Sequence, residues 1–370
     1  MAPCAKLTTR ITARTFALAL AASGLLGLAR NPGTSALTPP AHRPSGAAHR
    51  PTAAPAALLR ASVEARKRVS YVGQFETVRF GSKGAVATIV KIEHLAPDST
   101  RRWYVAPEAL YGDYSIERGT ATYDFDRRAG RLTISRNPSI DDQFARAGDF
   151  ERVLQNYRAI VSGAHDTVAN RLTESIVLVN KHTGERAERL WLDRETRLVL
   201  KKEEYHGNGS VAAQTRFEEL RYTDAIPRDL FSTAAPRGWA QVAGVDVKMP
   251  SSDIARAIKE AGFPAIEPKN LPQGFAVQSG DVATIDNVRT LHLVYSDGLR
   301  SISLFENGAG AAADFGTVRT RSLSFEGHDA QYVEDGPTTL ITWKEHDHSF
   351  ALVGDLQRSE LVRIAMSVVP

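Results

Sequence analysis

The sequence predicts an α+β protein in which a strongly curved antiparallel half-barrel sheet with covering helices is followed by a smaller α+β domain with its own antiparallel sheet. Apolar and polar residues alternate with a period of two along most of residues 69–222, which is typical of strands with one buried face. The stretch 186–222 shows this best, because turn-forming residues at 193–196 and 207–210 separate three alternating runs. A similar alternation resumes after residue 270. Each sheet therefore has one apolar face that other elements must cover.

The N-terminal segment has the pattern of a signal peptide. Lys6, Arg10 and Arg14 precede an apolar run from Thr15 to Leu28, and small residues follow around Ala29. The run is shorter than the roughly 20 residues that span a bilayer. We predict a signal peptide at 1–29, cleaved near Ala29, and export to the periplasm; retention as an N-terminal anchor is the alternative.

Residues 30–57 are rich in Ala and Pro and are predicted to form a disordered linker. The first 57 residues hold six of the 46 basic residues and no acidic residue. Without them 40 basic and 42 acidic residues remain, so the net charge of +4 becomes −2. Bulk charge therefore gives no indication of nucleic-acid binding.

The single cysteine, Cys4, lies in the leader. The mature protein is therefore expected to have no internal disulfide, no thiolate metal site and no cysteine nucleophile.

The first domain is predicted to span 58–231. Its first element is a short amphipathic helix that begins near Leu58 and ends near Lys67, and a second helix is predicted from Asp149, as its N-cap, to Ile160. The remaining segments are expected to be strands: 69–80, 85–95, 101–106, 114–119, 120–125, 131–136, 165–182 and the three runs of 186–222.

Residues 232–250 lose the alternation and are predicted to be an interdomain linker, with Trp239 packed on one domain. The second domain, 251–370, begins with a helix at 251–263 that Ser251 or Ser252 caps and Gly262 ends. Strands are expected within 271–285, 288–306, 317–335 and 339–355, and a closing helix at 356–368.

No catalytic motif is recognisable, so we predict that the protein is not an enzyme and needs no cofactor. The Gly-Ala run at 308–313 has the spacing of a dinucleotide fingerprint but lacks a surrounding βαβ unit, which favours a flexible connection. His346 and His348 are the best metal-ligand pair, but no third ligand is identifiable, which favours a solvated turn and no metal site.

Several of the aromatic residues in the predicted strands of the first domain are expected to face one interior. Two interpretations remain, a filled core and a lipid-sized cavity between sheet and helix. The candidates for lining such a cavity are Phe75, Trp103, Tyr123, Phe125, Trp191 and Phe217.

The first domain contains the run RLWLDRETRLVLKKEEY at 189–205, with FEEL and IPRDLF after it. These motifs resemble the first domain of the RseB/MucB family of periplasmic sigma-factor regulators, and also the LolA/LolB-like lipoprotein carriers. LPQGF at 271–275 and YSDGL at 295–299 resemble the second domain and distinguish the regulators from the carriers.

The resemblance implies a non-enzymatic regulator. It implies a LolA-like first domain that senses a lipid and a second domain that grips the periplasmic part of an anti-sigma factor, shields it from regulated proteolysis and releases it when lipid binds. A lipid or lipoprotein carrier is the alternative function. The oligomeric state stays open. The partner-binding residues that the resemblance implies are Pro272, Gly274, Phe275, Tyr295, Ser296, Asp297, Gly298 and Leu299.

Overall fold

The computed structural model describes residues 54–81, 84–136, 147–246, 252–285, 288–308, 320–325, 327–335, 338–354 and 356–368. The predicted signal peptide, nearly all of the Ala-Pro segment and the Gly-Ala run after Gly308 lie outside the described residues. No helix in the described part is both long and apolar enough to cross a membrane.

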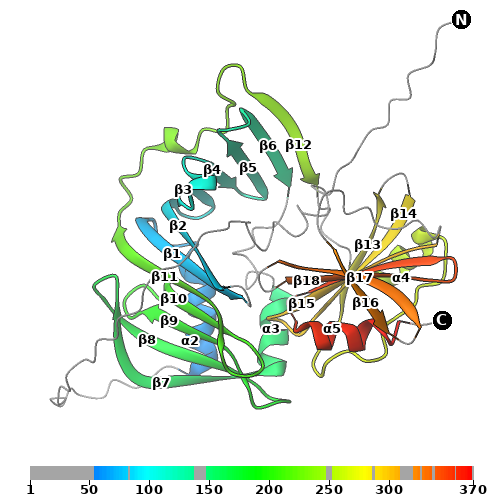
Figure 1. The fold of residues 1–370 in the computed structure, drawn as a ribbon. Helices are drawn as coiled ribbons and strands as arrows, with labels where there is room; N and C mark the ends of the chain where they lie inside the picture. Colours follow the sequence, from blue (N-terminus) through cyan, green and yellow to red (C-terminus); the bar gives the residue numbers. More distant parts are fainter. Residues whose placement is uncertain are drawn as a thin grey trace, which may run out of the picture.

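The first sheet has 12 strands in the order β12-β6-β5-β4-β3-β2-β1-β11-β10-β9-β8-β7 and curves strongly (Figure 1). Its two end strands, β12 and β7, do not pair with each other, so the described sheet is an open half-barrel. Every neighbouring pair is antiparallel except β12 and β6, which are parallel. The strands are β1 (Tyr71–Gly81), β2 (Gly84–Leu95), β3 (Ser99–Ala106), β4 (Tyr114–Arg118), β5 (Ala121–Asp126), β6 (Arg131–Arg136), β7 (Tyr157–Val168), β8 (Arg171–Asn180), β9 (Arg186–Asp193), β10 (Val199–Tyr205), β11 (Val211–Tyr222) and β12 (Ala240–Asp246).

Two helices, α2 (Pro55–Ala65) and α3 (Ala147–Asn156), lie on the concave side of this sheet (Figure 1). Leu58 and Leu59 of α2 and Val153 of α3 are buried against leucine and isoleucine side chains of β8 and β9. The predicted fold of the first half, a curved sheet with helices on its concave side, is confirmed.

The helix predicted at 149–160 was placed too far along the chain. Helix α3 ends at Asn156, and Tyr157 is the first residue of β7. Tyr157 is buried in the same cluster as α3, whereas Ile160 is 40% exposed on the strand. Tyr157 and Ile160 continue the helical spacing of the apolar residues in α3. The start of β7 was therefore predicted as helix.

The segment predicted to be only a linker, 232–250, includes a strand of the first sheet. After β11 the chain passes η3 (Arg228–Phe231) on the convex side and then adds β12 beside β6. Trp239 packs against Phe125 at a ring-centroid distance of 6.3 Å, in agreement with its expected role of pinning this segment. Since β12 is an edge strand with an exposed valine, it lacks the alternation of a half-buried strand.

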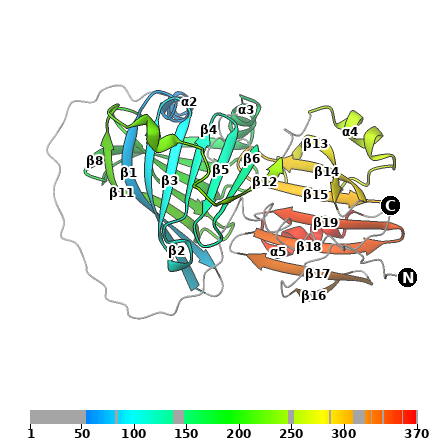
Figure 2. The same cartoon turned by 90° about the horizontal axis from the view of Figure 1, so that it is seen from above.

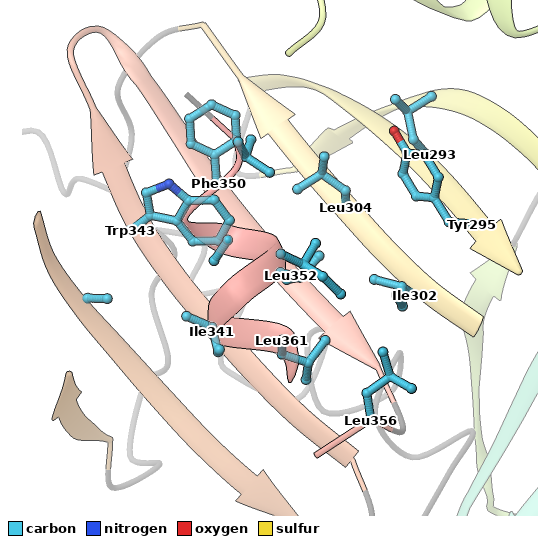
Figure 3. Packing of buried hydrophobic residues seen from close by; sticks show 14 of the residues in the cluster. Leu293, Tyr295, Ile302, Leu304, Ile341, Trp343, Phe350, Leu352, Leu356 and Leu361 are labelled. Carbon is cyan, nitrogen blue, oxygen red and sulfur yellow. The ribbon is translucent and has the colours of Figure 1, made fainter. Parts of the chain in front are cut away.

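The second sheet has seven strands in the order β13-β14-β15-β19-β18-β17-β16 and lies beside α3 and the open side of the first sheet (Figure 2). Its strands are β13 (Ala276–Ile285), β14 (Val288–Ser296), β15 (Ser301–Asn307), β16 (Arg321–Phe325), β17 (His328–Asp335), β18 (Thr338–Glu345) and β19 (His348–Gly354). Helices α4 (Ile254–Ala261) and α5 (Arg358–Ala365) contribute to one core with the apolar face of this sheet; Figure 3 shows Leu361 of α5 beside Ile341 and Leu352.

The N-cap of α4 differs from the prediction. Asp253, rather than Ser251 or Ser252, accepts a hydrogen bond from the backbone N–H of Arg256 at 3.0 Å. Gly262 ends this helix in a left-handed conformation, as expected.

Candidate partner-binding and ligand-binding site

The predicted partner-binding residues come together at one corner of the second sheet, where the loop before β13 lies next to the turn between β14 and β15. The carboxylate of Asp297 closes this turn, because its Oδ1 accepts hydrogen bonds from the backbone N–H groups of Leu299 at 3.0 Å and Arg300 at 2.8 Å. Gly298 supplies the left-handed conformation that the turn requires, with φ of +103°. The sequence therefore builds a fixed turn at this corner.

This corner contacts the end of α3 through side-chain donors that bind backbone carbonyl groups. Arg152 Nη1 donates to the oxygens of Ala276 at 3.2 Å and Ser296 at 3.1 Å. Asn156 Nδ2 donates to the oxygens of Gly274 at 3.1 Å and Asp297 at 2.9 Å. Two side chains of α3 thus satisfy four carbonyl groups of the second sheet.

A buried ionic group lies at the centre of the same contact. Tyr157 Oη donates to Asp297 Oδ2 at 2.5 Å, and the Nε and Nη2 atoms of Arg300 both lie 3.2 Å from that oxygen. Asp297 is fully buried and Tyr157 nearly so. Burial, and then the neighbouring Asp297 carboxylate, raise the pKa of Tyr157, so the phenol stays protonated and remains a donor.

The backbones approach closely at two glycines. A Cβ atom on Gly298 would lie 2.6 Å from the backbone nitrogen of Val153, and one on Gly274 would lie 2.7 Å from Oδ1 of Asn156. Leu299 packs on the core beneath α3. We call this region the inter-sheet contact: Arg152, Val153, Asn156 and Tyr157 of the first half, and Gly274, Ala276 and 296–300 of the second.

The structure thus uses most of the predicted partner-binding residues inside the chain. Ser296, Asp297, Gly298, Leu299 and Gly274 contact the first half. The side chains of Phe275 and Tyr295 are buried in the core of the second sheet, and Pro272 accepts the backbone hydrogen bond that precedes β13. Their role in binding a partner remains a prediction.

Sequence reasoning missed the residues of α3 and β7 that hold the turn, namely Arg152, Asn156 and Tyr157. The acceptors of Arg152 and Asn156 are backbone carbonyl groups, which every sequence offers, so nothing in the pattern marks these two donors. Tyr157 donates to the carboxylate of Asp297, which lies 140 residues away in the sequence. The available signal was the polar residue pair before Tyr157, at the end of an otherwise amphipathic helix.

The six aromatic candidates for a lipid cavity do not share one interior. Phe75 pairs with Phe217 across β1 and β11, on the face that also bears Tyr71. Trp103 lies on the opposite face by register and stacks on Tyr114 at 5.5 Å, next to Phe125. Tyr123 shares this second face. Trp191 belongs to the same buried cluster as Phe75 and Phe217. The six candidates are therefore divided: Phe75, Trp191 and Phe217 lie in one cluster, and Tyr123 and Phe125 in another. Their role in binding a ligand remains a prediction.

The concave face carries buried charges. Lys202 Nζ lies 2.7 Å from Glu204 Oε1 and 3.5 Å from Glu188 Oε1. Burial raises the pKa of Glu188. Although burial opposes it, the two carboxylates raise the pKa of Lys202, so the ammonium group stays charged between them.

A second polar group lines the concave face of β2–β5. Arg66 and Arg102 both pair with Glu117, at 3.1 Å and 2.6 Å. The fully buried His94 contacts Thr100 through Nδ1 and the carbonyl oxygen of Arg66 through Nε2, each at 2.8 Å, and burial lowers its pKa to about 4. Burial and the charge of Glu117 raise the pKa of Asp124 to about 6. Part of the concave wall is therefore ionic rather than aliphatic.

His346 and His348 bind carboxylates individually. Nδ1 of His346 lies 2.8 Å from Glu345, and Nδ1 of His348 lies 2.7 Å from Glu306. Within the described residues, no group of three or more His, Cys, Asp or Glu side chains is arranged to hold a metal ion.

Comparisons with known families divide the chain in two. Residues 117–235 match the family model of the MucB/RseB N-terminal domain. Residues 265–368 match a family described only as a domain of unknown function, DUF4367. A search of the curated proteins finds no match.

Two solved structures share the fold of this chain over most of its length. The crystal structure of MucB in complex with MucA(peri) is 18% identical, covers 86% of this chain and 99% of that chain, and gives a TM-score of 0.58. The MucA/MucB complex of Pseudomonas aeruginosa is also 18% identical, covers 85% of this chain and 98% of that chain, and gives a TM-score of 0.59. A LolA superfamily protein from Nitrosomonas europaea is 10% identical, with a TM-score of 0.24 over 48% of this chain and 96% of its own.

The first of the two sheets contains the matched residues 117–235, and both sheets contribute to the fold that is shared with MucB. Residues 117–235 are thus similar to the MucB/RseB N-terminal domain, and the chain as a whole shares the fold of MucB.

Proposed function

We propose that this protein is an exported, non-enzymatic regulator that binds the periplasmic part of an anti-sigma factor. The observation that carries the proposal is the fold shared with MucB, which was crystallised with the periplasmic part of MucA, over 86% of this chain, together with the MucB/RseB domain match. The signal-peptide pattern of residues 1–29 supports export, and the charge balance of the remainder gives no case for a nucleic-acid partner.

The inter-sheet contact gives this binder a fixed shape. With the domain boundaries proposed at 58–231 and 251–370, side chains of α3 anchor the second domain through backbone hydrogen bonds and the buried group of Tyr157, Asp297 and Arg300. A partner that contacts both domains then meets one preorganised surface, which lowers the entropic cost of binding. In this proposal residues 272–275 and 295–299 favour partner binding indirectly, because they keep the two domains in a fixed orientation.

Binding protects the anti-sigma factor from regulated proteolysis, and a lipid ligand reverses it. The open half-barrel of the first sheet supports a ligand site, with Phe75 and Phe217 as its apolar part. The alternative function, a lipid or lipoprotein carrier, is less well supported, because a carrier needs no second domain and the strands β13–β19 form a second sheet here.

The test uses the purified mature protein and the periplasmic segment of the single-span anti-sigma factor encoded nearest to its gene. Isothermal titration calorimetry is expected to give a one-to-one complex, and the segment should be cut more slowly by a site-specific protease when the complex is present. Leu299→Ala removes a side chain of the inter-sheet contact and is expected to weaken binding, whereas Leu172→Ala, at an exposed position of β8, is the matched control.

Three results would contradict parts of the proposal. No complex with the anti-sigma segment would contradict the regulator function. Equal affinity of the Leu299→Ala variant and the wild type would contradict the role of the inter-sheet contact. Reproducible hydrolysis in an esterase or peptidase screen would contradict the absence of catalysis.

A further inference from the structure

A pocket of about 370 Å³ lies on the first sheet. Its floor comes from adjacent strands β9, β10 and β11, and its wall from the end of β7. Trp191 belongs to the floor and faces away from Leu190, which packs under the helices. The lining residues are Asp166, Thr167, Val168, Arg189, Trp191, Lys201, Glu203 and Arg216.

The indole of Trp191 is held in place by charged neighbours. Its Nε1 donates to Asp166 Oδ2 at 2.6 Å. The guanidinium carbon of Arg189 and the Nζ of Lys201 lie 4.3 Å and 4.2 Å from the ring centre. Cation–π contacts at these distances fix both cations at the pocket floor.

The acidic groups of the lining already have partners. Glu203 binds Lys201 Nζ at 2.8 Å through Oε1 and accepts from the hydroxyl of Tyr205 at 2.6 Å through Oε2. Asp166 accepts from Trp191 and lies 3.8 Å from Arg189.

Two donors of the lining remain without an acceptor. The Nε atoms of Arg189 and Arg216 are buried and have no hydrogen-bond partner. Glu218 comes no closer than 3.7 Å to Arg216 Nε, and both side chains are nearly half exposed, so of Arg216 only the Nε atom is buried. A buried guanidinium N–H without an acceptor is costly, so an acceptor supplied by a ligand would be stabilising.

We infer that this pocket binds a carboxylate. Three cationic and two anionic side chains line it, which leaves one positive charge that a monoanion neutralises. A doubly charged anion would exceed that charge and meet Asp166 and Glu203 at close range. The carboxylate comes either from a free small acid or from an acidic side chain of a peptide. Because the pocket lies away from the inter-sheet contact, this inference is independent of the proposed anti-sigma binding.

The experiment is 19F NMR of the mature protein labelled with 5-fluorotryptophan. The chain has four tryptophans, and Trp191→Phe identifies the Trp191 signal. The probes, at constant ionic strength, are sodium acetate, sodium sulfate, and the capped peptides acetyl-Gly-Glu-Gly-amide and acetyl-Gly-Gln-Gly-amide. We expect a saturable shift of the Trp191 signal with acetate and a weaker or no shift with sulfate and the Gln peptide.

The two carboxylate sources are separated by the Glu peptide. A saturable shift with this peptide supports the pocket as a site for acidic side chains, and a response to acetate alone supports a site for free small acids. Three results would overturn the inference. The first is tighter binding of sulfate than of acetate. The second is equal shifts with the Glu and Gln peptides together with no response to acetate, and the third is no saturable shift with any probe.

Arg216→Gln is expected to weaken acetate binding about tenfold, because it removes a charge-assisted donor. Arg216→Lys keeps the charge without the planar donors and should give an intermediate affinity. Arg221→Gln, an exposed position of the same strand, is the control and should change the affinity less than twofold. If the Arg216→Gln protein does not fold, the affinity of the Arg216→Lys protein for acetate is the test. A wild-type affinity in that variant would overturn the role of Arg216 as a donor to the carboxylate.

Discussion

Tyr157 and Asp297 lie 140 residues apart and belong to different sheets, yet the hydroxyl of Tyr157 donates a hydrogen bond of 2.5 Å to the carboxylate of Asp297. Arg300 binds the same carboxylate oxygen, so the charge of Asp297 is balanced where water has no access. This pair is the polar centre of the contact that orients the second sheet on the first.

Replacing Tyr157 with Phe is expected to lower the free energy of unfolding by about 2 kcal/mol, because a buried carboxylate loses a donor. Urea unfolding, followed by circular dichroism, measures this. Tyr111→Phe is the matched control, since that side chain is largely exposed. An unchanged stability of the Tyr157→Phe protein would show that the hydrogen bond contributes nothing net.

Gly298→Ala tests the close approach of the turn to α3. The added Cβ would meet the backbone of Val153 at 2.6 Å, in addition to the strain of a left-handed alanine. Gly209→Ala is the matched control, because Gly209 has a similar φ of +80° and open space around it. We expect a loss of about 1 kcal/mol for Gly209→Ala and about 2 kcal/mol more for Gly298→Ala. Equal losses would mean that α3 moves aside at little cost.

His94 predicts a loss of stability in acid. Its pKa falls from 6.5 to about 4 on folding, so the unfolded chain binds the extra proton first as the pH decreases. The contribution of His94 is therefore complete above pH 6.5 and is lost progressively down to pH 4, by about 3 kcal/mol in total.

The control for this effect is His94→Gln, whose amide retains one donor and one acceptor. Asp124 acts in the opposite direction, because its pKa is raised to about 6 and its contribution is lost as the pH rises through that value. Asp124 is present in both proteins, so the difference between them isolates His94. Urea unfolding between pH 7 and pH 4.5 should show the steeper decline in the wild type; parallel curves would exclude His94 as the cause.

Lys202→Met is expected to destabilise the first sheet by about 3 kcal/mol at pH 7, because Glu188 and Glu204 then face each other without a cation. The loss should become smaller as the pH falls, because burial raises the pKa of Glu188 and its protonation removes one of the two negative charges. The double variant Lys202→Met/Glu188→Gln, which removes one of the two negative charges, should recover part of the stability at pH 7. No recovery would show that the ammonium group acts mainly by packing.

The sequence predicted the strands well where one face is buried and the other is not, as in β15, whose residues alternate between buried and more exposed positions. Two kinds of feature could not be predicted from the sequence. Edge strand β12 buries little, so its residues carry no such pattern. Tyr157 and Ile160 match helix and strand spacing equally, so the change from α3 to β7 depends on tertiary contacts.

The candidate site was predictable only in part. The motifs at 271–275 and 295–299 identified the correct corner of the second sheet, but the side chains that hold it come from 152–157. Arg152 and Asn156 bind backbone oxygens there, and Tyr157 binds the carboxylate of Asp297. The faces of Trp103 and Trp191 could not be assigned, because a strand shows the parity of its residues and not which parity points to the concave side.

The route of the chain from β11 to α4 has a mechanical consequence. The last strand before the second sheet, β12, is hydrogen-bonded to β6 at one rim of the half-barrel, whereas Arg152 and Asn156 grip the second sheet from the end of α3. The second sheet is therefore held to the first in two ways, by the covalent connection after β12 and by the non-covalent contact with the end of α3. Cleavage of one peptide bond between Asp246 and Ile254 would leave the two fragments associated. They would separate only after the hydrogen bonds from the end of α3 to the second sheet were also broken.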